Sequence, residues 1–160
     1  MRRFSRRHIL TLAAYLGTAG ANVTFAVAQT ATSASGARVA LDGYDPLSYF
    51  EPGRPEKGSP KFQFAFDDAV YWFNSADHQA RFAADPERYA PQYGGYCATA
   101  LAAGEKVEAD PHAWSISNGK LYVFGAKEGV PEFKRNPESV VSQANSNWQR
   151  LREPKLALPS

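Results

Sequence analysis

The chain contains two stretches of one pattern, which coincide without a gap when the sequence is shifted by 51 residues. The shift superposes a turn pair, three aromatic positions and a Pro-Glu pair: Asp67-Asp68 on Asn118-Gly119, Tyr71 on Tyr122, Phe73 on Phe124, Phe82 on Phe133 and Pro86-Glu87 on Pro137-Glu138. In each stretch the pattern predicts a strand, a tight turn, an aromatic strand and a helix. The alternative is a coincidence between two ordinary hairpin–helix units. The first strands favour that alternative, because the shift aligns the aromatic Phe64 with the polar Ser115.

The same signals place the elements along the chain. We expect strands at 62–66, 70–73, 113–117 and 121–124, and Asn118-Gly119 is the strongest hairpin turn in the sequence. Helices should follow both hairpins, with a short helix over 96–103 and a final helix over 138–152. The predicted fold class is therefore α+β: two β-hairpins, each followed by a helix, packed around one core, plus a short central helix and a C-terminal helix.

The N-terminal residues predict an export signal. Ser5–Leu10 resembles the twin-arginine motif, and Ala26-Val27-Ala28 forms a small-x-small cleavage site after an apolar run. We expect a signal peptide over 1–28, cleaved after Ala28, export to a bacterial periplasm, and no membrane attachment afterwards. The alternative is an uncleaved amphipathic anchor. A flexible lead-in (29–39), the folded domain (40–152) and a C-terminal tail (153–160) would follow.

Charge and composition exclude several function classes. Outside residues 1–28, which carry four arginines and no acid, the chain has 14 basic and 16 acidic residues, so nucleic-acid binding is not expected. The single cysteine excludes an intramolecular disulfide and an all-cysteine metal site. The common nucleophile, phosphate-loop and dinucleotide motifs are missing from the sequence, so no enzyme is predicted. Thiol chemistry at Cys97 is left open.

Two residues at predicted helix starts are candidate metal ligands. A helix N-terminus favours the thiolate of Cys97 and keeps the imidazole of His78 neutral, and both forms bind soft metals. Two such ligands suffice for Cu(I), whereas a tetrahedral zinc site would also need His112 and a carboxylate or water. The alternatives are a buried, inert thiol and solvent-facing histidines.

Three segments together resemble the YHS domain family in its exported, single-domain form: Leu41–Phe50, Val70–His78 and Tyr93–Ala98. The resemblance covers roughly residues 40–150 and implies a small α+β module that binds heavy metals. Metal-binding members resemble Asp-Pro-x-Cys followed by Tyr-x-Phe-Cys-Ser and a further Cys or His. Carried over by position, these ligands fall on Ser48, Asn74 and His78, of which only His78 keeps a ligand type. The second stretch has Gly125 and Gly129 at the last two positions and would be purely structural.

These observations predict a periplasmic YHS-like module that binds copper or zinc through Cys97 and His78. The alternative is a module that binds a non-metal small ligand or a periplasmic protein partner. Its pocket would lie in the tyrosine-rich segment 89–97, with Tyr44, Tyr93 and Tyr96 as its candidate residues.

Overall fold

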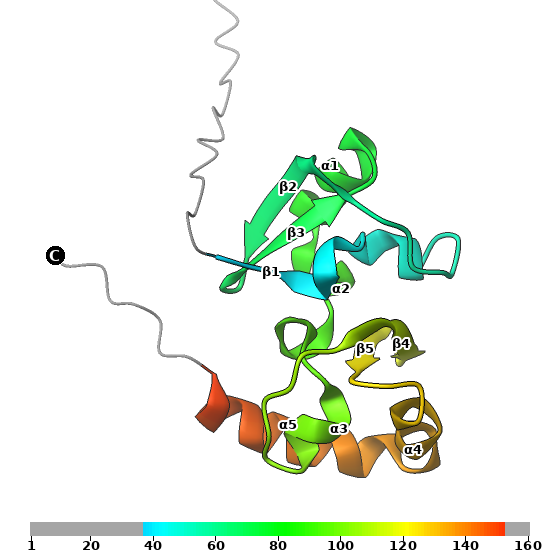
Figure 1. Cartoon of the computed structure of the whole chain (residues 1–160), viewed down its shortest axis with the longest axis vertical. Helices are drawn as coiled ribbons and strands as arrows, with labels where there is room; N and C mark the ends of the chain where they lie inside the picture. The colour runs from blue at the N-terminus through cyan, green and yellow to red at the C-terminus, as the bar shows by residue number, and fades with distance from the viewer. Residues whose placement is uncertain (1–36, 153–160) are drawn as a thin grey trace, which may run out of the picture. The chain divides into compact units, whose positions relative to one another are not determined.

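The structure, a computed structural model, describes residues 37–152, so the predicted signal peptide and the C-terminal tail lie outside the described residues. Its elements (Figure 1) are β1 (Arg38–Val39), η1 (Ala40–Gly43), η2 (Pro46–Tyr49), β2 (Ser59–Phe66), β3 (Ala69–Phe73), α1 (Ala76–Ala84), α2 (Pro86–Tyr89), η3 (Gln92–Gly95), α3 (Ala98–Ala102), β4 (Asp110–Ser117), β5 (Lys120–Phe124), α4 (Gly129–Arg135) and α5 (Pro137–Leu151). The fold is mixed α+β, as predicted. Arg38 and Val39, which the sequence placed in the lead-in, form a parallel edge strand on β3. Within residues 37–152 no helix has the length and apolarity to cross a bilayer.

The two hairpins repeat each other residue by residue. Phe64 pairs with Tyr71 in the first hairpin, and Ser115 pairs with Tyr122, 51 positions later, in the second. Each first strand also breaks its register at the same place, between Ser59 and Gln63 and between Asp110 and Trp114. The repeat predicted from the sequence is thus present in the structure, and the mismatch of Phe64 with Ser115 changes the side chain without changing the pairing.

Both turns take the left-handed geometry that a two-residue hairpin loop requires. The φ angles are 47° and 66° at Asp67 and Asp68, and 50° and 72° at Asn118 and Gly119. Asn, Asp and Gly tolerate positive φ better than other residues do, which is why these turn pairs could be identified from the sequence.

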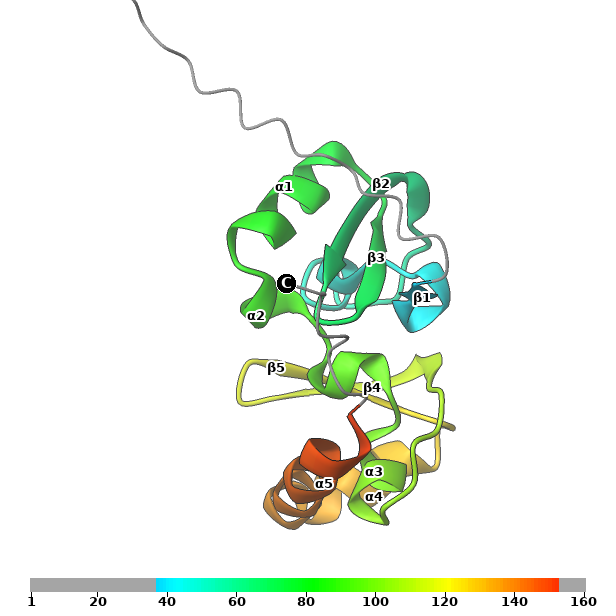
Figure 2. The same cartoon turned by 90° about the vertical axis from the view of Figure 1, so that its left-hand side faces the viewer.

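A buried phenylalanine joins each hairpin to its helix. The ring of Phe82, on α1, lies 5.1 Å from the rings of both Tyr71 and Phe73. Phe133, on α4, lies 4.9 Å from Tyr122 and 5.3 Å from Phe124. Figure 2 shows α1 beside the strands β2 and β3 that it covers. Aromatic pairs at these separations each contribute about 0.5–1.5 kcal/mol beyond the burial of their surface.

The repeat also extends upstream of the hairpins, where the sequence did not reveal it. Leu41 and Asp42 in η1 have left-handed φ angles of 53° and 48°, and Tyr93 and Gly94 in η3 have 60° and 61°. The next turn is matched as well. The N–H of Asp45 donates to the carbonyl of Glu56 at 2.9 Å, and the N–H of Cys97 donates to that of Val107 at 2.9 Å. The upstream residues up to Asp45 match at an offset of 52 rather than 51, and Cys97 lies inside the second copy at the place that Asp45 occupies in the first.

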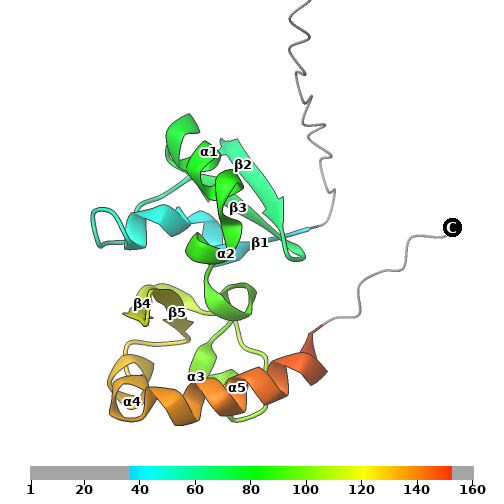
Figure 3. The ribbon, with the colours of Figure 1, turned by 180° about the vertical axis from the view of Figure 1, so that it is seen from behind.

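The buried side chains form two clusters that meet at β5. Leu121 and Val123 belong to the first cluster, which also holds the η1, η2, β3 and α1 side chains. Tyr122 and Phe124 belong to the second, with Phe133 and the inner faces of α3 and α5. Figure 3 shows α3 and α5 side by side. Because alternate residues of a strand point to opposite faces, β5 is covered on both sides.

Candidate functional site

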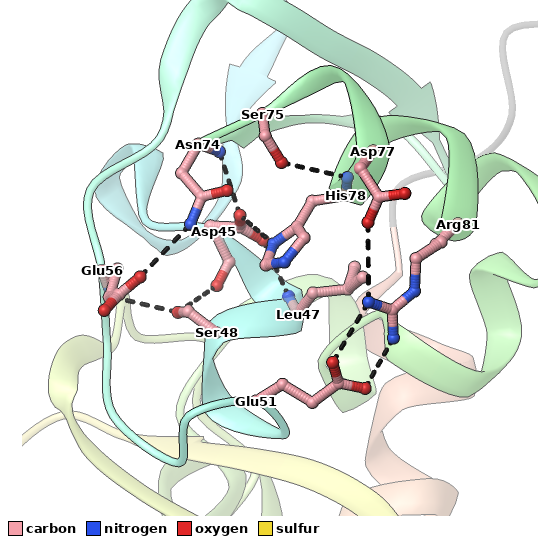
Figure 4. A network of polar contacts seen from close by, with 10 residues as sticks. All are labelled: Asp45, Leu47, Ser48, Glu51, Glu56, Asn74, Ser75, Asp77, His78 and Arg81. Atoms are coloured by element: carbon pink, nitrogen blue, oxygen red, sulfur yellow. Dashed lines mark hydrogen bonds and ion pairs between the residues drawn. The ribbon is translucent and has the colours of Figure 1, made fainter.

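His78 is held by a buried carboxylate. The residue lies in the first turn of α1, where its N–H donates to the Oγ of the N-cap Ser75 at 3.2 Å. Its ring Nδ1 lies 2.7 Å from Oδ2 of Asp45, a residue with no exposed surface. Figure 4 shows the imidazole turned toward this carboxylate. The cap of α1 and the start of η2 together position the pair.

Asp45 accepts every hydrogen bond that reaches its carboxylate. The N–H of Leu47 donates to Oδ1 at 2.8 Å, and the N–H of Asn74 donates to Oδ2 at 2.9 Å. An ionised carboxylate has only acceptors, so it is matched to three donors. When Nδ1 of His78 is the donor in this contact, Nε2 is the ring nitrogen left for other chemistry.

The three ligand positions implied by the family resemblance gather around Asp45. Besides His78, the Oγ of Ser48 donates to the carbonyl of Asp45 at 2.6 Å and accepts from the N–H of Glu56 at 3.0 Å. The side-chain amide of Asn74 donates to Oε2 of Glu56 at 3.2 Å. These polar atoms are engaged with one another. In the described part of the chain, no three or more His, Cys, Asp or Glu side chains are grouped so as to hold a metal ion.

Cys97 belongs to a different part of the molecule. It is 4% exposed and packs in the second cluster, where its Sγ caps α3 by accepting from the N–H of Ala100 at 3.4 Å. The Oγ1 of Thr99 lies 3.3 Å from the same sulfur. Among residues 37–152, the described contacts of this thiol and those of His78 have no residue in common. A metal site shared by Cys97 and His78 stays a prediction that these contacts do not support.

The three candidate pocket tyrosines separate into two groups. The Tyr44 hydroxyl lies 3.1 Å from Nε2 of His112, and the ammonium of Lys57 lies over the Tyr44 ring at 4.2 Å. Tyr93 and Tyr96 instead flank Trp148 of α5, with ring centroids 6.1 Å and 6.0 Å from the indole. Tyr93 and Tyr96 each line a cavity.

The cavity lined by Tyr93 has a volume of about 390 Å³, within the range of roughly 300–1,000 Å³ typical of small-molecule sites. Its walls come from both copies and from α5: Phe66, Asp67, Tyr71, Glu87, Ala90, Pro91, Gln92, Tyr93, Gly94, Lys120, Asn145, Trp148 and Arg152. The segment 89–97 thus supplies several of them. A neighbouring cavity of about 330 Å³ shares four wall residues with it: Asp67, Gly94, Trp148 and Arg152. Tyr96 lines this second cavity.

Tyr71, one of the residues that line the larger cavity, has a buried hydroxyl without a hydrogen-bond partner. In the described residues, its hydroxyl is the single buried side-chain nitrogen or oxygen that has no hydrogen-bond partner. Burial raises the pKa of Tyr71 above its usual range, while Arg38 lowers this pKa and Asp67 raises it by smaller amounts. The phenol is therefore neutral at ordinary pH and keeps a proton to donate.

The sequence allows Tyr71, like the other tyrosines of the folded domain, to line a pocket without singling it out, and it gives no sign of a site at Trp148. Tyr71 occurs in an alternating aromatic strand and Trp148 at helical spacing, and both patterns are those of ordinary core residues. Comparison with known protein families, curated proteins and solved structures found no match to this chain.

Proposed function

We propose that the protein binds a small organic molecule in the cavity lined by Tyr71, Tyr93 and Trp148. Two observations carry the proposal: the buried Tyr71 hydroxyl has no partner, and Tyr71 is one of the residues that line a cavity of ligand size. A buried polar group without a hydrogen bond costs about 1–3 kcal/mol, and a ligand that accepts this hydrogen bond recovers that free energy. The aromatic walls add stacking surface for a planar group.

The other buried tyrosines support this interpretation by contrast. The Tyr49 hydroxyl donates to the carbonyl of Pro111 at 3.0 Å, and the Tyr93 hydroxyl donates to Oδ1 of Asn145 at 3.0 Å. The fold therefore satisfies comparable hydroxyls with its own acceptors and leaves the one of Tyr71 without an acceptor. Binding of copper or zinc through Cys97 and His78 has no comparable support, since each side chain is engaged locally.

The test is a titration of the ¹⁵N-labelled whole chain with benzamide, a flat ring that carries a carbonyl acceptor. We expect the Trp148 indole N–H signal to shift, and cyclohexanecarboxamide to bind more weakly because it lacks the aromatic face. Tyr71→Phe should weaken benzamide binding about 3- to 10-fold, the value of one net hydrogen bond. Tyr44→Phe, outside both cavities, is the matched control and should bind normally.

Two results would overturn the proposal. One is benzamide binding that leaves the Trp148 signal unmoved or that Tyr71→Phe does not weaken. The other is the absence of binding by either amide, together with saturable shifts at Cys97 and His78 on addition of Zn(II) or Cu(I), which would return the assignment to a metal site.

A further inference from the structure

We infer that Tyr44 is a redox-active tyrosine, which gives one electron to a diffusible one-electron oxidant while its phenolic proton passes to the imidazole of His112. This inference goes beyond the proposed function and does not depend on the cavities. It rests on the contact between the two side chains, one from each copy. The Tyr44 hydroxyl lies 3.1 Å from Nε2 of His112, and the two rings meet edge to face with centroids 5.2 Å apart.

The proton of a phenol controls how readily the ring loses an electron. A phenol that has lost one electron is a strong acid, so the electron leaves more easily when a base is already hydrogen-bonded to the hydroxyl. Imidazole is the side chain best suited to accept a proton near neutral pH. When Nε2 of His112 is unprotonated, the Tyr44 hydroxyl donates to it, and the base is then in place before the electron leaves.

Other tyrosine hydroxyls have partners of a different kind. The Tyr49 hydroxyl donates to the carbonyl of Pro111, and the Tyr93 hydroxyl donates to the amide oxygen of Asn145, both at 3.0 Å. Carbonyl and amide oxygens accept a hydrogen bond, but they are too weakly basic to take up the proton. Tyr44 therefore differs from these tyrosines in having a partner that can hold the proton which oxidation releases.

Exposure and charge also favour Tyr44. Among the described tyrosines, Tyr44 and Tyr96 are half-buried and the others are buried, so these two are the most accessible to an oxidant in solution. The Tyr96 ring has two cations over it, the Arg38 guanidinium at 4.1 Å and the Lys106 ammonium at 4.5 Å. The Tyr44 ring has one, the Lys57 ammonium at 4.2 Å. Because positive charge opposes the removal of an electron, oxidation should occur at Tyr44 rather than at Tyr96.

Acidic side chains beside the pair offset the positive charges. The Lys57 ammonium lies 3.4 Å from Oδ2 of Asp42, and Oδ1 of Asp110 accepts from the backbone N–H of His112 at 2.8 Å. A carboxylate this close to His112 stabilises the imidazolium that forms. In the step itself, the oxidant takes one electron from the Tyr44 ring, the phenolic O–H bond breaks, and its proton binds Nε2 of His112. The products are a neutral phenoxyl radical, an imidazolium and the oxidant reduced by one electron.

Flash photolysis of the whole chain with tris(bipyridine)ruthenium and an electron-accepting quencher tests this inference. Photogenerated ruthenium(III) is the oxidant, and the absorbance of the phenoxyl radical is followed in time. His112→Gln keeps an acceptor but not a base, and it should slow radical formation on the order of 10-fold or more. Lys57→Gln should accelerate it, because the cation over the ring is lost. Tyr44→Phe should abolish the signal, and Tyr96→Phe, the half-buried control, should keep it.

Three results would overturn the inference. The first is a rate of radical formation that is the same in His112→Gln as in the unsubstituted chain. The second is a phenoxyl signal that Tyr44→Phe retains in full, which would place the oxidation at another tyrosine. The third is a rate that is unchanged in deuterium oxide, which would show that the proton does not move with the electron. Unfolding of a variant cannot imitate the expected slowing, because it would expose the buried tyrosines to the oxidant.

Discussion

Asp45 and Cys97 occupy the same place in the two copies, yet their surroundings differ in polarity. Each accepts a hydrogen bond from the turn that follows it, from the N–H of Leu47 at 2.8 Å and from that of Ala100 at 3.4 Å. Around the carboxylate, Asn74 and His78 supply two more donors. In the second copy glycines replace both, so a weakly polar thiol is sufficient there.

Asp45→Asn should lower the free energy of unfolding by about 2–3 kcal/mol, because an amide replaces a buried, charged acceptor by one acceptor and an unmatched donor. Urea denaturation measures the loss. In a His78→Ala background the cost of Asp45→Asn should be smaller, since one of the three donors is gone. An equal cost in both backgrounds would show that the imidazole contributes nothing to holding the carboxylate.

Tyr71→Phe should leave the free energy of unfolding unchanged or slightly raised, because it removes a buried hydroxyl that has no partner. Tyr49→Phe is the matched comparison. It should lose about 1 kcal/mol or more, since the Pro111 carbonyl then loses its donor. Chemical denaturation of the two variants without ligand checks this, and a clear loss in Tyr71→Phe would mean that the hydroxyl has a partner in solution.

At the scale of the elements, local signals in the sequence were enough for the hairpins and the helix ends. Turn pairs, the Ser75 cap and the prolines act within a few residues, so each could be identified without the rest of the fold. The upstream copy could not, because Leu41 and Asp42 adopt positive φ without being glycines. Their similarity to the η3 segment is a property of the backbone, and only the Gly-Tyr pairs at 43–44 and 95–96 hint at it.

The candidate site was less predictable than the elements. Several residues of segment 89–97 line a cavity in the structure, and the tyrosines and glycines of this segment mark an irregular, aromatic stretch of the sequence. The free hydroxyl of Tyr71 depends on which acceptors the tertiary structure brings near, and no sequence pattern encodes this. The same reason prevented the sequence from deciding whether Cys97 and His78 converge.

Two glycines that stand where the first copy has Asn74 and His78 should differ in their tolerance of a side chain. A Cβ on Gly129 would lie 2.9 Å from the Cβ of Phe124, whereas one on Gly125 would first meet the Cys97 sulfur at an ordinary 3.7 Å. Gly129→Ala should therefore lower stability by about 1–3 kcal/mol, and Gly125→Ala should change it little. Thermal unfolding of both proteins compares them, and equal midpoints would contradict the packing described here.

The segment after η2 is fixed to α1 by an ion pair whose pH dependence is predictable. The Arg81 guanidinium donates to both carboxylate oxygens of Glu51, at 2.5 and 3.1 Å, and this holds the pKa of Glu51 below its usual value. A depressed carboxyl pKa stabilises the fold above the unfolded-state pKa, and this contribution is lost as pH falls through the folded-state value. A carboxyl-carbon NMR titration of Glu51 should show a lowered midpoint, which Arg81→Gln returns toward normal. An unchanged midpoint in that variant would exclude the ion pair.

At the scale of the whole molecule, the two copies are joined through shared side chains. Tyr49 of the first copy donates to the Pro111 carbonyl and lies edge-on to Trp114, with ring centroids 5.3 Å apart. Leu121 and Val123 of the second copy complete the first cluster. Each copy therefore needs the other to bury its apolar surface.

Phe82→Ala should consequently destabilise both copies together, by about 3–5 kcal/mol. Hydrogen exchange should accelerate by the same factor for the amides of β3 and for those around Ala144 in α5, although Phe82 belongs to the first cluster and Ala144 to the second. Phe133→Ala is the reciprocal variant and should give the same uniform acceleration. Exchange that speeds up in only one copy would show that the two units unfold independently.

Strand β5 is buried on both of its faces. In a chain built of two matched halves, the simplest expectation is that either half would fold on its own. Here, separating the halves would expose Leu121 and Val123 on the C-terminal fragment. It would also expose the face of the first cluster that contains Phe73 on the N-terminal fragment. The two copies thus share one backbone pattern, but they must fold together because side chains of the second copy complete the core of the first.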